Sequence, residues 1–289
     1  MPPASADSVD GLLPLDGTTR LIAIIGDPIA QVKSPGGVTR ALQAKGRNAI
    51  VVPVHVPAAD VDTFLRAAAL VRNLDGIIAT VPHKFAAYAH CATATSRADL
   101  LQAANTLRRN DDGSWHGDHL DGEGFVAAMR HAGCEPHRQR ALLAGAGGAG
   151  SAIGLALLDA GVAALGIHDD DPVRRDALVG RLSTCYPDRV AVAVADPTGY
   201  AVVVNATPAG MRDGDPYPVR ADKLSQAMFV GDVITVPAVT PLLATARKLG
   251  CRSATGIDMF AAVCALMVEF LLDRPATGAM TAPPAAKVH

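Results

Sequence analysis

Aromatic side chains and an excess of either charge are what this sequence most lacks. Phe, Tyr and Trp make up 4% of the 289 residues, whereas hydrophobic residues make up 49%, so the core must be built from Ala, Val, Leu and Ile. The 26 basic and 28 acidic residues leave a formal net charge of -2. That balance gives no electrostatic footprint for nucleic acid or an anionic membrane. We therefore expect a small-molecule ligand and neither a nucleic-acid nor a membrane partner.

Paired cysteines and long apolar runs are missing as well. The first twenty residues have no basic segment followed by an apolar one, and no run reaches the length of a membrane span. The absence of C-x-x-C pairs argues against a zinc site or a disulfide framework, so we expect no bound metal and a reducing, cytoplasmic location. The cysteines occur singly, at Cys91, Cys134, Cys185, Cys251 and Cys264.

A glycine-rich turn is the strongest positive signal. An apolar run at 142–144 leads into Gly145, Gly147 and Gly150 with G-x-G-x-x-G spacing, and an alanine-rich helical pattern follows. A strand, a tight turn and a helix N-terminus in this order suit a dinucleotide, because the pyrophosphate binds the free N–H groups of the helix. A purely structural glycine turn is the alternative. The candidate cofactor residues here are Gly145, Gly147, Gly148, Ala149 and Gly150.

An acidic cluster follows the next predicted strand, at 164–168. A carboxylate there, roughly twenty residues past the glycines, typically binds the adenosine ribose hydroxyls. Asp169 or Asp170 would fill this role and would repel the extra phosphate of NADP, so we favour NAD over NADP. Arg174 and Arg175 follow closely and keep NADP possible. Alternatively, Asp171 before a proline simply caps the next helix.

Strands and helices alternate along the chain, which predicts parallel sheets with crossover helices and an α/β fold. Asp111-Asp112-Gly113 predicts a hairpin turn, and a long apolar helix is expected at 256–272. The strands are expected at 21–25, 49–56, 76–81, 140–144, 164–168, 201–204 and 228–233, and the other helices at 38–45, 61–71, 122–133 and 152–160.

Two charged residues stand at element ends where open α/β sheets place reactive groups. Lys84 follows a strand end and a proline, a position facing a crevice, although a solvated surface lysine is the commoner outcome. Asp121 opens the helix at 122–133 and is placed to act as its N-cap, and it could be a cap and nothing more. The loop after the strand at 201–204 suits a cover over a nicotinamide. Its candidate cofactor residues are Asn205, Thr207, Pro208 and Met211, with Gly256 at the start of the last helix.

Over about residues 20 to 272 the chain resembles the shikimate/quinate dehydrogenase family. The matching motifs occur in the same order: Gly26-x-Pro28-Ile29 to Ser34-Pro35, Thr80 to Lys84, Ala104 to Leu107, Gly117-Asp118 to Asp121-Gly122, Gly145 to Gly150, Asn205 to Met211, and Thr240 to Leu243. The resemblance implies hydride transfer between NAD(P) and a ring hydroxyl, as in the 3-dehydroshikimate/shikimate interconversion. It implies that Lys84 and Asp121 are the catalytic pair and that Ser34, Thr80, Asn105 and Asp121 hold the substrate.

The resemblance also implies two domains. Residues 20–121, completed by 256–272, would form an open α/β substrate domain with a mainly parallel sheet. Residues 122–255 would form a Rossmann-type, doubly wound nucleotide domain, and 1–19 and 273–289 would be loose tails. The oligomeric state, monomer or homodimer, is left open, because alanine-rich helices suit cores and interfaces equally.

Several positions depart from the family pattern, and in these the chain most resembles a divergent, shikimate dehydrogenase-like branch. Usual polar residues are replaced at Val32, Ile78, Leu120, Thr235 and Val263, and the usual Asn-Thr-Asp appears as His119-Leu120-Asp121. Loss of polar partners weakens selection for hydroxyl groups, so a less hydroxylated ring acid would suit the site better. Quinate or aminoshikimate dehydrogenase activity and a non-catalytic ligand sensor remain alternatives. The two-domain folate dehydrogenase architecture is disfavoured by the segment from Gly117 to Asp121.

Overall fold

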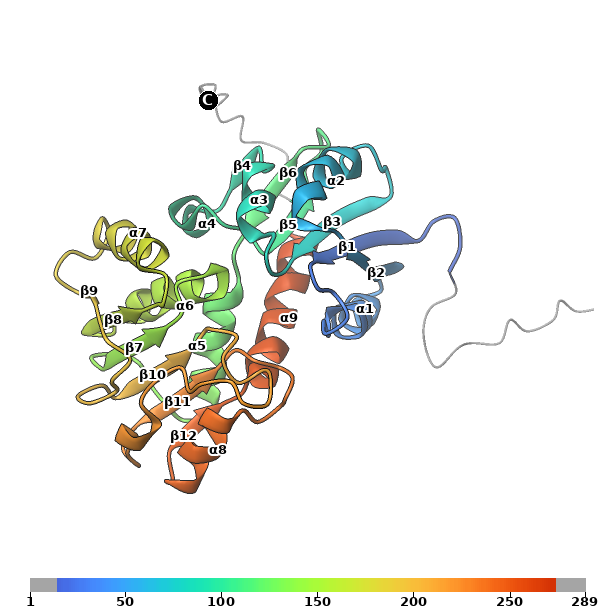
Figure 1. Ribbon diagram of the computed structural model, residues 1–289. Coiled ribbons are helices and arrows are strands. Elements are labelled where there is room, and N and C mark those ends of the chain that lie inside the picture. The colour runs from blue at the N-terminus through green and yellow to red at the C-terminus, as the bar shows by residue number, and fades with distance from the viewer. Residues whose placement is uncertain (1–14, 274–289) are drawn as a thin grey trace, which may run out of the picture.

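The computed structural model describes residues 15–273 and contains two six-stranded sheets, each with helices packed on it (Figure 1). This confirms the predicted α/β class with two mostly parallel sheets. Most of the two expected tails lies outside the described residues. Of the expected leader, Asp16, Thr18 and Thr19 form a turn that hydrogen-bonds to Asn48.

The first sheet has the strand order β2-β1-β3-β5-β6-β4. The pairs β1–β2 and β1–β3 are parallel, whereas β5 and β6 form the antiparallel hairpin predicted from the turn at 111–113. The hairpin is the part of the sheet that alternation alone did not predict. The strands are β1 (Arg20–Gly26), β2 (Ala49–His55), β3 (Leu74–Ala79), β4 (Thr93–Ala94), β5 (Thr106–Arg109) and β6 (Trp115–Asp118).

Short helices connect these strands. Pro35 lies in the first turn of the helix after β1, where a missing N–H costs nothing. Thr95 caps the helix after β4 by accepting a hydrogen bond from the backbone N–H of Ala98. The helices are α1 (Ser34–Ala44), α2 (Val61–Ala68), α3 (Lys84–Ala89) and α4 (Ser96–Leu101).

The second sheet is parallel throughout, in the order β12-β11-β10-β7-β8-β9. Its central strands read as unbroken apolar runs because helices cover both faces. This is the doubly wound arrangement expected of a nucleotide domain. The elements are β7 (Arg140–Ala144), α6 (Gly148–Asp159), β8 (Ala164–His168), α7 (Pro172–Ser183), β9 (Val190–Val192), β10 (Val202–Asn205), β11 (Phe229–Asp232), α8 (Pro241–Lys248) and β12 (Arg252–Ala254).

Two long helices join the sheets. α5 (Asp121–His131) leaves the first sheet for the second, and α9 (Gly256–Leu272) returns, so that the two run side by side between the halves (Figure 1). They approach closely at Gly124, where an added Cβ would lie 2.2 Å from a methyl carbon of Val263. A capping box between Thr255 and Asp258 starts α9. α9 therefore belongs in space to the first sheet, which it reaches from the far end of the chain.

Candidate active site

Lys84 is a buried residue, not a solvated surface lysine. It is the first residue of α3 and only 7% exposed, and its ammonium forms an ion pair with the Asp121 carboxylate. The preceding His83 fixes the turn, because its ring Nε2 lies 2.7 Å from the carbonyl oxygen of Val56. A lysine is rarely buried unless its charge is paired, so this placement points to a specific use.

Asp121 is the partner of Lys84, and the expectation that it caps α5 is wrong. The N-cap residue is Leu120, and Asp121 is already helical with its side chain turned away from the first-turn amides. Instead, Asp121 Oδ2 meets Lys84 and Oδ1 accepts a hydrogen bond from Asn105 Nδ2 at 2.7 Å. Burial raises the pKa of Asp121, but the Lys84 ammonium and these hydrogen bonds outweigh it and the net pKa is lowered. The carboxylate is therefore ionised at neutral pH.

Asn105 sets the position of that carboxylate. The side chain is 1% exposed, and its Oδ1 accepts from the backbone N–H of Leu120 at 3.1 Å and from Thr106 Oγ1 at 3.0 Å. One amide side chain thus anchors the start of α5 and donates to Asp121 at the same time. Ser34 is buried at the start of α1, and Thr80 lies half-buried against Gly26. Within residues 15–273 neither of their hydroxyl groups has a hydrogen-bond partner, so both are available to a ligand.

The glycine turn has the geometry that a pyrophosphate requires. Gly145 has φ +105°, and a Cβ on Gly150 would lie 1.9 Å from the Gly145 carbonyl oxygen, so neither position accepts a side chain. Nothing lies within 4 Å of a Cβ built on Gly147. Gly147 is also the N-cap residue of α6 and leaves the first-turn N–H groups, including that of Ala149, without a side-chain cap. These residues fit the dinucleotide predicted from the sequence.

The three aspartates after β8 have three different positions. Asp169 is 6% exposed, and its carboxylate accepts from the Ala146 N–H at 2.6 Å and from the Arg174 guanidinium at 2.6 and 3.1 Å. Asp171 caps α7, as the alternative interpretation proposed, by accepting from the N–H groups of residues 173 and 174. Only the Asp170 side chain is fully exposed, 3.5 Å from the His168 ring. Asp169 stabilises the glycine turn, which leaves Asp170 as the candidate for the ribose.

The loop after β10 is tied together by a residue that no sequence motif singled out. Asp232 at the end of β11 is buried, and it accepts hydrogen bonds from Asn205 Nδ2 at 3.1 Å and from the Thr240 hydroxyl at 2.8 Å. Asn205 in turn accepts from the backbone N–H and the hydroxyl of Thr207. Asn205 therefore shapes the loop from within. Pro208 and Met211 are exposed on its surface.

Gly256 opens α9 at a close backbone crossing. A Cβ at this residue would lie 2.4 Å from the carbonyl oxygens of Val233 and Ile234. The absence of a side chain lets α9 begin against the end of β11. Close packing is thus the structural reason for glycine at position 256. The cofactor contact of Gly256 stays a prediction.

The two halves of the molecule meet at the Lys84–Asp121 pair. A Cβ built on Gly148, the first residue of α6, would lie 2.9 Å from Lys84 Cδ. A buried lysine–carboxylate pair thus stands directly beside the turn that fits a dinucleotide. This arrangement defines an NAD(P)-dependent dehydrogenase built from two α/β units.

Comparison with known proteins agrees with this class. Residues 24–107 match the family model of the shikimate dehydrogenase substrate binding domain. A shikimate dehydrogenase (NADP(+)) of Rubrobacter xylanophilus is 36% identical over 248 residues, which cover 84% of this chain and 87% of the relative. The chain belongs to the shikimate dehydrogenase family.

Solved structures extend the likeness to both halves. A quinate dehydrogenase from Corynebacterium glutamicum in complex with NAD superposes with a TM-score of 0.79 at 27% identity, covering 88% of this chain and 94% of that one. A shikimate 5-dehydrogenase from Listeria monocytogenes, in complex with shikimate and NAD, gives 0.79 at 25% identity over 89% and 93%. The family assignment therefore applies to the nucleotide half as well, which the family model does not reach.

The residues that replace the usual polar contacts are mostly buried. Ile78, Leu120 and Val263 are 2, 2 and 3% exposed, whereas Val32 and Thr235 are half-buried.

Within residues 15–273, no helix has the length and apolarity to cross a membrane, and no cluster of three or more His, Cys, Asp or Glu side chains could hold a metal ion.

Proposed function

We propose that this protein transfers a hydride between NAD(P) and a ring hydroxyl of a shikimate-like cyclic hydroxy acid, shikimate and 3-dehydroshikimate included. The observation that carries the proposal is the buried Lys84–Asp121 pair, held by Asn105 beside Gly148 at the glycine turn. The family membership and the names of its relatives support the same reaction.

In the oxidation, Lys84 and Asp121 manage the hydroxyl proton. The Lys84 ammonium passes one of its protons to the Asp121 carboxylate as it takes up the proton of the substrate hydroxyl, whose O–H bond breaks, and Asp121 also holds the lysine in place. Asn105 keeps Asp121 at the correct angle, and Ser34 and Thr80 orient the ring through their free hydroxyls. The bound nicotinamide supplies the hydride acceptor.

We propose further that NAD is preferred over NADP. The exposed Asp170 carboxylate follows β8, where an acidic residue commonly binds the adenosine ribose and would repel a 2′-phosphate, and Arg174 is already ion-paired with Asp169. The names of the curated relatives point the other way, towards NADP. Asp170→Ala should narrow the ratio of kcat/KM for NAD over NADP, and Asp171→Ala, a cap next to it, should leave that ratio unchanged. An unchanged ratio in Asp170→Ala would reject the role of Asp170.

We also propose a substrate with fewer ring hydroxyls than shikimate. Ile78, Leu120 and Val263 are buried apolar residues at positions where the family usually has polar ones. A site without polar partners gives up part of its selectivity for hydroxyl groups. Comparing kcat/KM for shikimate with that for ring acids lacking one hydroxyl tests this point, and a preference for the fully hydroxylated acids would contradict it.

Initial rates with shikimate and quinate, each with NAD and with NADP, test the main proposal. Lys84→Ala should abolish turnover, whereas Lys45→Ala, an exposed lysine after α1, should not. Activity that survives in Lys84→Ala would refute the assigned chemistry. Ligand binding without turnover on any ring acid would favour a non-catalytic sensor instead.

A further inference from the structure

His119 is a deeply buried group that the mechanism above does not use. The residue is 1% exposed and both of its ring nitrogens are buried; within residues 15–273 neither nitrogen makes a close hydrogen bond, and only the backbone of Gly148 interacts with the ring as a weak hydrogen-bonding group. Burial lowers its pKa to about 4, so the ring is neutral near pH 7. Buried polar atoms without partners are rare and call for a functional or structural reason.

The ring lies beside the catalytic pair. His119 Nδ1 is 4.0 Å from Asp121 Oδ2, and the backbone of Gly148, in the nucleotide half, is the ring's weak hydrogen-bonding neighbour. The backbone N–H of His119 donates to Asp118 Oδ1 at 2.7 Å, which fixes the residue between β6 and α5. The charged groups around the ring are Asp118 on β6, Asp121 on α5 and Lys84 on α3.

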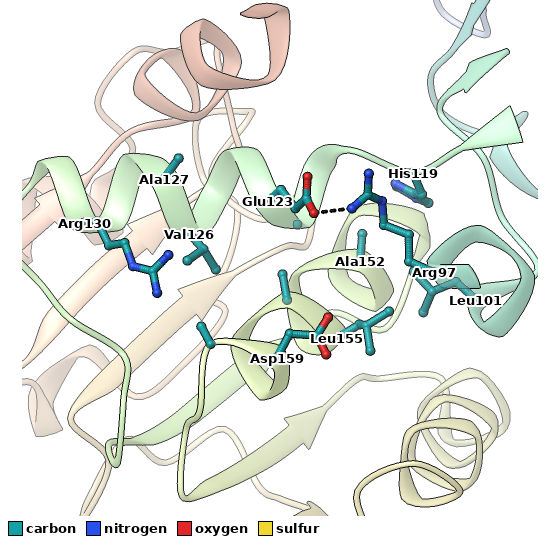
Figure 2. A pocket seen from close by; sticks show the side chains of 13 residues that line it. Arg97, Leu101, His119, Glu123, Val126, Ala127, Arg130, Ala152, Leu155 and Asp159 are labelled. Atoms are coloured by element: carbon teal, nitrogen blue, oxygen red, sulfur yellow. Dashed lines mark hydrogen bonds and ion pairs between the residues drawn. The ribbon is translucent and has the colours of Figure 1, made fainter. Parts of the chain in front are cut away.

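On its other side His119 lines a pocket between α4, α5 and α6. The pocket has a volume of about 370 Å³, with His119 at one end and Arg130 at the other (Figure 2). Glu123 and Asp159 are exposed at its rim, and Arg97, which is ion-paired with Glu123, crosses it near the histidine (Figure 2). The imidazole therefore separates Asp121 from a cavity that reaches the surface.

The oxidation releases a proton at the buried Lys84–Asp121 pair, and this proton needs a path to solvent. The Lys84 and Asp121 side chains are already only 9 and 11% exposed, and a ring substrate beside a nicotinamide covers what remains. The proton taken from the substrate hydroxyl then has no direct way to solvent through the substrate side. A neutral imidazole has one nitrogen that accepts a proton and one N–H that gives one up, so it can pass a proton without keeping it.

We propose that His119 carries the hydroxyl proton of the substrate from Asp121 to solvent in the pocket between α4, α5 and α6. This inference rests on the proposed dehydrogenase function. Lys84 gives one ammonium proton to Asp121 Oδ2 as it takes up the proton of the substrate oxygen, and Oδ2 then passes its proton to Nδ1. As the Nδ1–H bond forms, the Nε2–H bond breaks. Because Nε2 is buried, the ring must turn towards the pocket for this proton to pass to water.

The 4.0 Å between Nδ1 and Oδ2 requires an approach of about 1 Å or one bridging water. The ring regains its starting tautomer by exchange with solvent after the products have left, when the substrate side is open again. The two substrate electrons leave with the hydride, so that the reaction releases one proton in total.

Stopped-flow measurement of the first oxidative turnover, with a pH indicator beside the absorbance of the reduced nicotinamide, tests the proposal. In the unaltered enzyme the proton and the reduced nicotinamide should appear together. In His119→Asn the proton should lag behind the reduced nicotinamide and appear only when the products leave. His116→Asn makes the same change within β6, shortly before His119, where the ring contacts Thr93 and Phe270, and should cause no delay.

Chemical rescue separates proton transfer from packing. In His119→Ala, free imidazole should restore prompt proton release, whereas pyrazole, a ring of the same size and far weaker basicity, should not. Prompt release in His119→Asn, or equal rescue by both rings, would overturn the proposal while the dehydrogenase function stands. No reduced nicotinamide from the unaltered enzyme with any ring acid would overturn both.

Discussion

Gly122→Ala should separate the two halves of the active site. Gly122 follows Asp121 in α5, and a Cβ there would lie 2.1 Å from the carbonyl oxygen of Ala152 and 2.8 Å from the Cβ of Ala156, both in α6. Ordinary contact needs about 3.5 Å, so relief of the 2.1 Å approach requires α5 and α6 to move apart by about 1.4 Å. This backbone clash cannot be relieved by a side-chain rotation.

The displacement acts on catalysis as well as on stability. Overpacking of this kind costs about 1–3 kcal/mol, and a shift of about 1 Å between reacting groups costs about a hundredfold in rate. We expect kcat to fall about a hundredfold because Asp121 moves away from the glycine turn. The affinity for NAD should change little, because the glycine turn itself is not altered. Steady-state kinetics and thermal unfolding give the two quantities.

Gly180→Ala is the matched control. Gly180 lies in α7 with nothing within 4 Å of an added Cβ, so the change should raise stability by about 0.5–1 kcal/mol without affecting kcat. If Gly122→Ala behaved like Gly180→Ala in both assays, the contact between α5 and α6 would not set the spacing of the site.

Three further changes test individual groups. Lys84→Met should lower kcat by a factor of about 10²–10⁴ without weakening NAD binding. It should also raise the pKa of Asp121, because the effect of burial is then opposed only by Asn105 and His119. Carboxyl NMR titration measures this pKa, and an unchanged value would contradict the coupling between Lys84 and Asp121. Asp171→Ala removes the cap of α7 and should lower the free energy of unfolding, measured with denaturant, by about 1 kcal/mol. An unchanged free energy of unfolding would show that the cap does not stabilise the fold. Burial raises the pKa of Asp169, but Arg174 and two backbone amides outweigh it, so the folded pKa lies below 3.8. Its stabilisation is therefore present above pH 4 and is lost as the pH falls further. Asp169→Asn should lower the melting temperature at pH 7 more than at pH 3, and an equal loss at both would disprove the assignment.

The sequence predicted most elements of the fold because its signals are local. β7, β8 and α9 have the bounds expected from apolar runs and punctuating glycines. The sequence predicted less well where tertiary contacts decide. The local pattern gave Asp121 and Asp171 the same role, an acidic N-cap, and only Asp171 has it, since its backbone is extended at φ -90°, ψ 103° while the residue before Asp121 is already helical.

The pairing within the site could not be predicted from local patterns, because its members are distant in the chain. Lys84 and Asp121 are 37 residues apart and meet where α3 and α5 begin. The role of Asp169 was likewise hidden, because it depends on the Ala146 N–H pointing towards the end of β8. Resemblance to a family supplied the pair but gave no role to Asp232 or His119.

Burial of charge distinguishes the residues that sequence patterns left equivalent. A lysine and an aspartate excluded from water would each destabilise the fold alone, so their joint burial requires a third group, Asn105, and a fixed geometry. The same exclusion that keeps Asp121 ionised also removes the solvent to which a proton would be lost. A site that strengthens its catalytic charges by burial must therefore provide a separate way out for the proton, and His119 is the titratable group placed between the pair and the pocket.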